Sequence, residues 1–266
     1  MSFKGGWLNI KEENYTQADA LLRYVLRLAD DALITGQRLA EWCSKGPVLE
    51  QDIALSNMAL DHIGRARLLY KYAADLVGDG KTEDDFAYLR DTHEFQNFLI
   101  VEQPNGHWGD TVAKLMCLDT YNFYLFDGLT KSADAQLSAI AQKAIKEITY
   151  HAQWSAEWVI RLGDGTEESH QKVQESLEEI WQWTGELFEV DQVERMMAEA
   201  GIGVNPESIK DAWNSKVNQV LDIATLQRPA DCWMQTGGRK GVHSEHLGYM
   251  LAEMQVLPRA YPDAKW

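Results

Sequence analysis

The chain has 266 residues, a formal net charge of −16 at pH 7 and 45% hydrophobic residues. The charge argues against proteins that bind nucleic acid or an anionic membrane surface, and the apolar content is typical of a globular protein. The three cysteines are far apart and have no metal-ligand spacing, so neither a zinc site nor a disulfide framework is predicted.

The N-terminal segment MSFKGGWLNIKEEN lacks the apolar run of a signal peptide. No stretch of 18 apolar residues, the length that suggests a membrane-spanning helix, occurs in the sequence. We therefore expect a cytoplasmic protein without a membrane span.

Most of the chain carries apolar residues three and four positions apart, which predicts an all-α protein. Residues 16–44 form the first predicted helix, and the second runs from Pro47 to Gly78. Because the link between them is short, we expect an antiparallel hairpin. A long excursion broken by glycines and prolines follows, and then a second hairpin of helices at 109–131 and 133–162.

Two long hairpins joined by a long crossover are the connectivity of a ferritin-like four-helix bundle. No low-complexity linker follows the second hairpin, so we predict one domain over residues 1–266. Its core bundle covers about 16–163, and a helical C-terminal extension covers about 164–266. Helices are predicted in this extension at 167–188, 191–199, 206–224 and 243–256.

The stretch KEITYHAQWS places Glu147 and His151 four residues apart, on the side of their helix that faces the bundle interior. Di-iron bundles use Glu-x-x-His, with a spacing of three. Here Tyr150 stands three residues after Glu147. In the partner hairpin, Gly64 stands three residues after Asp61. Glycine offers no ligand and a phenol is an unusual one, so we predict no metal and interpret these five positions as remnants of a di-iron site.

Neighbouring residues leave the ligand set incomplete. His62 is turned by about 100° from Asp61, and we predict that it does not replace the missing ligand. Asp30 or Asp31 and Asp119 are positions for the other two bundle carboxylates. Gly64 also fits a point where two helices pack closely.

Two interpretations of the predicted site remain open. Asp61, Glu147 and His151 form either a buried polar network or a weak, at most mononuclear, metal site.

Several stretches resemble one known family along nearly the whole chain. They are GQRLAEWC (36–43), LDHIGRAR (60–67), VEQPNG (101–106), KEITYHAQWS (146–155), TGGRKGVHSEHLG (236–248) and MLAEMQ (250–255). These stretches are similar to the C subunits of bacterial phenylacetyl-CoA epoxidases.

The resemblance implies a ferritin-like structural subunit without an active site of its own. Its expected partner is a di-iron catalytic A subunit, in a heterodimer that assembles further with other subunits. That A subunit inserts one oxygen of O2 into the ring of phenylacetyl-CoA to give the 1,2-epoxide. The resemblance therefore implies that this chain itself binds no cofactor. The alternative is a di-iron or mononuclear oxygenase or oxidase that acts on its own.

Two further segments are candidate contacts with acyl-CoA or with a partner. Arg239 and Lys240 follow two glycines just before a predicted helix, where they would bind a CoA phosphate, dock on an acidic partner, or belong to a plain connecting loop. The resemblance places HEFQN on the crossover near the acyl-CoA at the boundary with the A subunit. The candidate contacts there are Glu94, Phe95, Gln96 and Asn97.

Overall fold

The computed structural model describes residues 15–262 and 264. The segment from which we predicted the absence of a signal peptide, residues 1–14, lies outside this range. Over the described residues the chain forms helices and no strand, as the spacing of apolar residues predicts. In the same range, none of the helices is long and apolar enough to cross a membrane.

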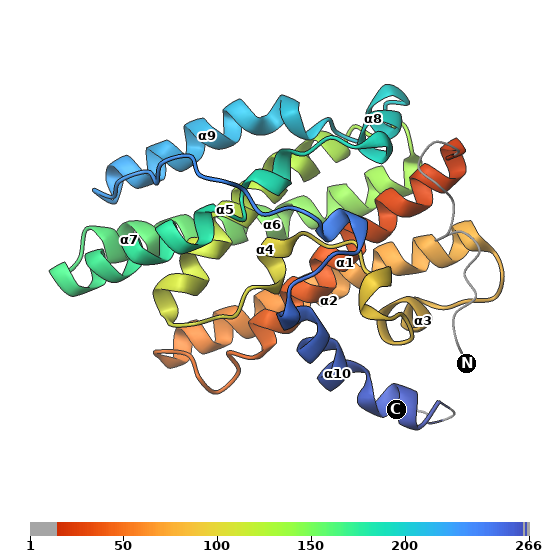
Figure 1. Ribbon diagram of the computed structural model, residues 1–266, viewed down its shortest axis with the longest axis horizontal. Helices are drawn as coiled ribbons and strands as arrows, with labels where there is room; N and C mark the ends of the chain where they lie inside the picture. Colours follow the sequence, from red (N-terminus) through yellow and green to blue (C-terminus); the bar gives the residue numbers. More distant parts are fainter. Residues whose placement is uncertain (1–14, 263, 265–266) are drawn as a thin grey trace.

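Four long helices form two antiparallel hairpins at the centre of the molecule (Figure 1). The first hairpin pairs α1 (Gln17–Ala40) with α2 (Leu49–Val77), and the second pairs α5 (Trp108–Leu129) with α6 (Ala135–Gly163). Helix α1 begins at a capping box in which Thr16 and Asp19 bind each other's backbone N–H groups. Helix α2 ends at Gly78, whose positive φ of 66° suits a glycine.

The crossover between the hairpins contains only short helices. These are α3 (Glu83–Tyr88), the 3-10 turn η2 (Thr92–Glu94) and α4 (Leu99–Glu102). This connectivity of two hairpins and a long crossover is the one predicted for a ferritin-like bundle.

The C-terminal extension packs along one side of the bundle. It consists of α7 (Glu167–Trp181), η3 (Gly185–Phe188), α8 (Gln192–Glu199), α9 (Pro206–Ile223), η4 (Gly238–Lys240) and α10 (Glu245–Ala260). Helices α7 and α9 contact α5, α8 contacts α1, and α10 contacts α3. The extension shares one hydrophobic core with the bundle, and the single domain over the whole chain stays a prediction.

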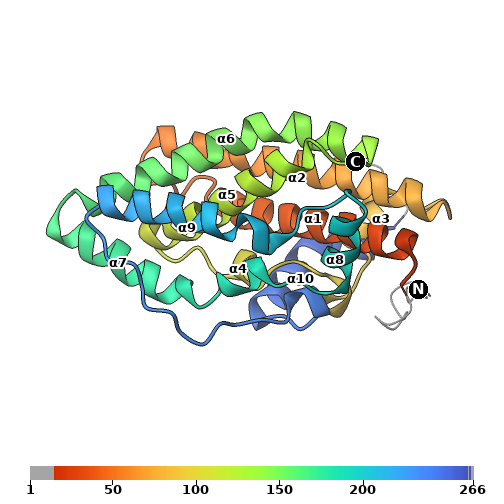
Figure 2. The ribbon, with the colours of Figure 1, turned by 90° about the horizontal axis from the view of Figure 1, so that it is seen from above.

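The two helices of the first hairpin differ strongly in burial. Helix α1 is buried over most of its length, because α2, α4 and α8 surround it. Figure 2 shows α2 on the side of the molecule opposite to α7 and α10. Much of the outer side of α2 is therefore covered by no other part of the described chain.

Candidate functional site

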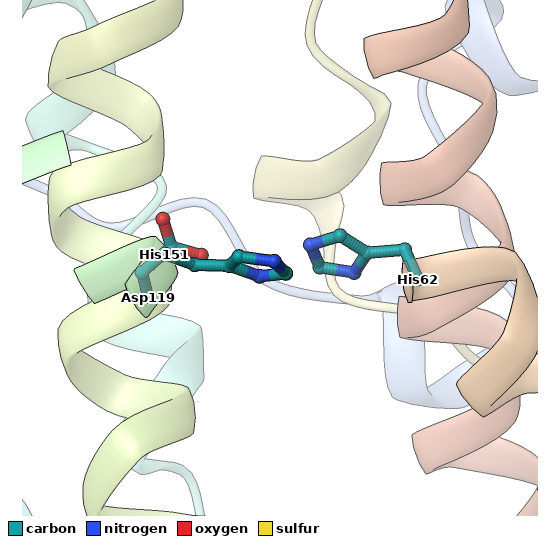
Figure 3. A group of neighbouring side chains, drawn as sticks. All are labelled: His62, Asp119 and His151. Atoms are coloured by element: carbon teal, nitrogen blue, oxygen red, sulfur yellow. The ribbon is translucent and has the colours of Figure 1, made fainter. Parts of the chain in front are cut away.

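Three polar side chains meet in the interior of the bundle (Figure 3). His62 comes from α2, Asp119 from α5 and His151 from α6, and all three are 1% exposed. The two imidazole rings stack with their centroids 5.1 Å apart. One ligand atom from each of the three residues lies within 4.8 Å of the others. We call these residues the central cluster.

Each ring of the central cluster is oriented by a charged neighbour. A guanidinium N–H of Arg65 donates to Nδ1 of His62 at 2.7 Å. On the opposite side, Nε2 of His151 lies 3.0 Å from a carboxylate oxygen of Asp61. The remaining atoms, His62 Nε2, His151 Nδ1 and Asp119 Oδ2, are buried and have no hydrogen-bond partner within residues 15–262 and 264.

Burial sets the charges of the central cluster. It lowers the pKa of His62 well below its usual value, and the charge of Arg65 lowers it further, so this imidazole is neutral. Burial also raises the pKa of Asp119 to about 6, although His151 and Ser155 act in the opposite direction. At neutral pH the cluster therefore contains a neutral His62 and a carboxylate whose ionised form is disfavoured by burial.

Arg65 is the buried positive charge next to the central cluster. Its side chain is buried and packs against the ring of Phe126, with 5.1 Å between the guanidinium carbon and the ring centroid. Burial lowers the pKa of Arg65 to about 10, and four carboxylates oppose that shift. Those carboxylates come one from each helix of the bundle: Asp31, Asp61, Asp119 and Glu147.

The structure places His62, rather than Asp61, in the interior of the bundle. Asp61 lies at the rim with its side chain 34% exposed, whereas His62 points into the bundle and stacks on His151. Three large apolar residues of α2, Leu49, Ile53 and Leu60, are exposed. The buried side carries another set of residues at helical spacing: Leu55, Met58, Ala59, His62, Ala66 and Leu69.

The other remnant positions do not occupy the places of metal ligands either. Gly64 is exposed, and Tyr150 is 50% exposed on the outside of α6. Glu147 is only partly buried. Our explanation of Gly64 by close packing is also wrong, because no atom lies within 4 Å of the position that a Cβ would take. Of the five positions, only His151 lies in the central cluster.

Asp30 and Asp31 bind other partners than a metal. Asp30 pairs with the fully buried Arg90, and it also accepts hydrogen bonds from the Tyr70 hydroxyl and the Gln96 amide. Asp31 accepts from the Phe98 amide at 2.8 Å. These two carboxylates hold the crossover against α1, which explains why they are buried.

The central cluster does not fit a di-iron centre. Such centres take a carboxylate from each of two helices and a Glu-x-x-His pair from each of the other two. Here the spacing of three on α2 joins His62 to Arg65, which is a cation with no lone pair to offer. Asp119 supplies the single carboxylate among the three clustered residues.

A small cavity of about 90 Å³ leads from the surface to Arg65. It lies between α2 and α6, and its walls include Asp61, Gly64 and Glu147. Three of the five remnant positions therefore line a cavity that reaches Arg65, beside the central cluster. A larger hollow of about 630 Å³ lies elsewhere, between α3 and α10.

The candidate acyl-CoA contacts on the crossover are inside the protein. Glu94, Phe95, Gln96 and Asn97 are each at most 9% exposed. The carboxylate of Glu94 accepts from the Asp91 amide, and Asn97 donates to Glu102. These side chains hold the crossover together, so a direct contact with a ligand is not available to them in this structure.

Arg239 and Lys240 have different surroundings. The guanidinium of Arg239 pairs with Asp31 at 2.8 Å, donates to the Gln96 carbonyl at 2.6 Å and stacks 3.5 Å over the Phe98 ring. Lys240 is exposed. Only Lys240 is therefore free to meet a phosphate or a partner.

Comparison with known proteins agrees with this fold. A family model described as "Phenylacetic acid catabolic protein" matches residues 8–266. The chain belongs to this phenylacetic acid catabolic protein family. Its ferritin-like, all-helical fold and its part in phenylacetate catabolism follow from that membership.

One curated relative supports the narrower resemblance. The chain is similar to the C subunit of the 1,2-phenylacetyl-CoA epoxidase of Escherichia coli (strain K12), with 46% identity over 246 residues. The alignment covers 92% of this chain and 99% of the relative. The resemblance drawn from the sequence is thereby confirmed.

Proposed function

We propose that the chain is the non-catalytic structural subunit of a cytoplasmic phenylacetyl-CoA 1,2-epoxidase. In this proposal it forms a heterodimer with a di-iron catalytic A subunit, assembles further with other subunits, and binds neither nucleic acid nor a membrane. The proposal rests on Arg65, beside the central cluster. This buried arginine stands three residues after His62 on α2, where a di-iron bundle would have a metal ligand. The relative from Escherichia coli supports it, since that protein is named as a subunit of the epoxidase.

The outer side of α2 is our candidate surface for the A subunit. Leu49, Ile53 and Leu60 follow a helical spacing and are 72%, 51% and 66% exposed. Large apolar side chains that remain exposed on one helix face are typical of a surface that another protein covers. Lys240 is the exposed one of our six candidate contacts, but it belongs to the extension and lies away from this side of α2.

The alternative, an oxygenase or oxidase that acts alone, has one observation in its favour. His62, Asp119 and His151 each hold a buried atom without a partner, and two histidines with one carboxylate can bind a single iron.

Reconstituted epoxidase separates the two functions. We expect Asp119→Asn and His151→Gln, assayed in complex with the A subunit and reductase, to retain at least half of the wild-type rate of phenylacetyl-CoA epoxidation. A loss of about 100-fold or more, with the complex intact by size-exclusion chromatography, would instead support catalysis in this chain.

A matched pair of variants tests the docking surface. Leu60→Asp should weaken binding of the A subunit at least 10-fold. Ile223→Asp replaces a side chain that is similarly exposed, at 53%, on α9 and should leave binding unchanged. Equal affinities for both variants would place the A subunit on another face.

A further inference from the structure

The position of the proton on His62 is fixed by Arg65. A guanidinium can only donate hydrogen bonds, so the Nδ1 atom 2.7 Å from Arg65 must be the acceptor. Since the imidazole is neutral, its single proton lies on Nε2. Nε2 is the atom of His62 without a partner in the described part of the chain. His62 therefore turns an N–H donor, not a lone pair, away from Arg65.

His151 has the opposite arrangement. The Asp61 carboxylate accepts from Nε2 at 3.0 Å, so the neutral form of His151 has its lone pair on Nδ1, which has no partner among the described residues. Metal-bound histidines are commonly oriented in this way, with a carboxylate on the far nitrogen. Asp119 adds a carboxylate oxygen that is also unpartnered. Two of the three side chains thus have a free lone pair, and His62 alone does not.

The charges around the central cluster also disfavour a bound metal ion. Asp31, Asp61, Asp119 and Glu147, one from each bundle helix, attract the charge of Arg65, although Asp31 also pairs with Arg239 and Asp61 with His151. Bound cations usually balance such a set of carboxylates in this type of bundle. A divalent ion in the central cluster would lie within a few ångströms of a buried guanidinium, and the repulsion is strong where water does not screen it.

We propose that the guanidinium of Arg65 takes the place of a metal ion at the centre of this bundle and keeps the central cluster metal-free. It does so by holding the His62 proton on Nε2 and by supplying the buried positive charge itself. The proposal concerns the interior of this chain and does not depend on which partner the chain has.

The proposal predicts that one substitution opens a metal site. In Arg65→Gln the cation is gone, and the amide oxygen of the new side chain can accept the proton of His62 from Nδ1. The lone pair of His62 then lies on Nε2, which completes a set of two histidines and one carboxylate. The cavity of about 90 Å³ between α2 and α6 reaches Arg65, so the substituted side chain would lie at its wall.

Cobalt(II) is a suitable probe, because its visible absorption reports nitrogen and oxygen ligands. The experiment compares wild type, Arg65→Gln and Arg65→Lys, each purified with a chelator, desalted and titrated with CoCl₂. We expect Arg65→Gln to bind one Co²⁺ at least 100-fold more tightly than wild type, with new visible bands that disappear in Arg65→Gln/His62→Ala. Arg65→Lys retains a buried donor and a positive charge, so it should resemble wild type.

Each other outcome contradicts the proposal. Wild type that binds one Co²⁺ and loses it in His62→Ala would have a resident metal site, with Arg65 no obstacle. Folded Arg65→Gln that binds no more Co²⁺ than wild type would show that Arg65 is not what excludes the metal. If Arg65→Gln is unfolded in the chelator, circular dichroism must show refolding on addition of Co²⁺, and failure to refold also refutes the proposal.

Discussion

Replacing Arg239 by alanine tests whether this residue serves the fold or an external ligand. Its guanidinium and the Asp31 carboxylate are 11% and 12% exposed and lie 2.8 Å apart. Removing one partner of a buried ion pair leaves an uncompensated charge and costs about 3–5 kcal/mol. Loss of the stacking on Phe98 acts in the same direction. We therefore expect Arg239→Ala to lower the free energy of unfolding by about 4 kcal/mol at pH 8.

The loss should depend on pH in a defined direction. Burial raises the pKa of Asp31 to about 6, against the effect of Arg239, and this pKa rises further in the variant. At pH 5 the folded variant can protonate the carboxyl and avoid an unpaired charge. The destabilisation by Arg239→Ala should thus be smaller at pH 5 than at pH 8.

Urea titrations at both pH values measure these differences, provided that circular dichroism and tryptophan fluorescence give coincident transitions. Lys240→Ala is the matched control, because this neighbouring side chain is exposed and its loss should change stability by less than about 0.5 kcal/mol. A loss below about 1 kcal/mol for Arg239→Ala would refute our assignment of Arg239 to the fold and return it to the candidate ligand contacts.

Three further predictions concern the bundle and its titratable groups. Gly36→Ala should lower the free energy of unfolding by about 1–3 kcal/mol, because its Cβ would lie 3.0 Å from Ile63. Gly64→Ala should raise it by up to about 1 kcal/mol, since no atom lies near the added Cβ. Equal urea midpoints for the two variants would contradict both expectations. Because the pKa of Asp119 is raised to about 6, the free energy of unfolding of the wild type falls as the pH rises from about 4 to 6. Asp119→Asn should remove up to about 3 kcal/mol of that fall, and an unchanged pH profile of stability would refute the assignment. Burial lowers the pKa of His243, but its bond to Glu102 raises it overall, so the stabilisation is full below about pH 6.5 and lost above the raised pKa. His243→Gln should therefore cost more at pH 6 than at pH 9 in thermal melts, and the opposite order would refute the assignment.

The helices and their connectivity could be predicted from the sequence because apolar spacing and breakers are local signals. The predicted helix over 133–162 matches α6 closely, and its inward side, with His151, was assigned correctly. The helix predicted over 167–188 ends at Trp181, and a separate 3-10 turn follows. Such boundaries depend on tertiary packing, which local patterns do not contain.

The inward side of α2 could not be predicted from its large apolar residues. Leu60 and Ile53 face outward, so the arc that they define is turned away from the true interior. The signal for His62 was present in its helical spacing to the buried Met58, Ala59 and Ala66. Arg65 was missed for a second reason: a buried arginine is rare unless it is paired, and the pairing becomes visible only when four helices are brought together.

Metal content tests the central claim most directly, that this chain is a structural subunit without a metal centre of its own. The full chain, expressed alone in iron-supplemented medium and purified without chelators, is measured by mass spectrometry against its protein concentration. Our account predicts iron and other transition metals far below one per chain. A di-iron bundle should carry about two irons per chain, and a value near one or two would contradict the account and require that the chain be assayed as an oxygenase itself.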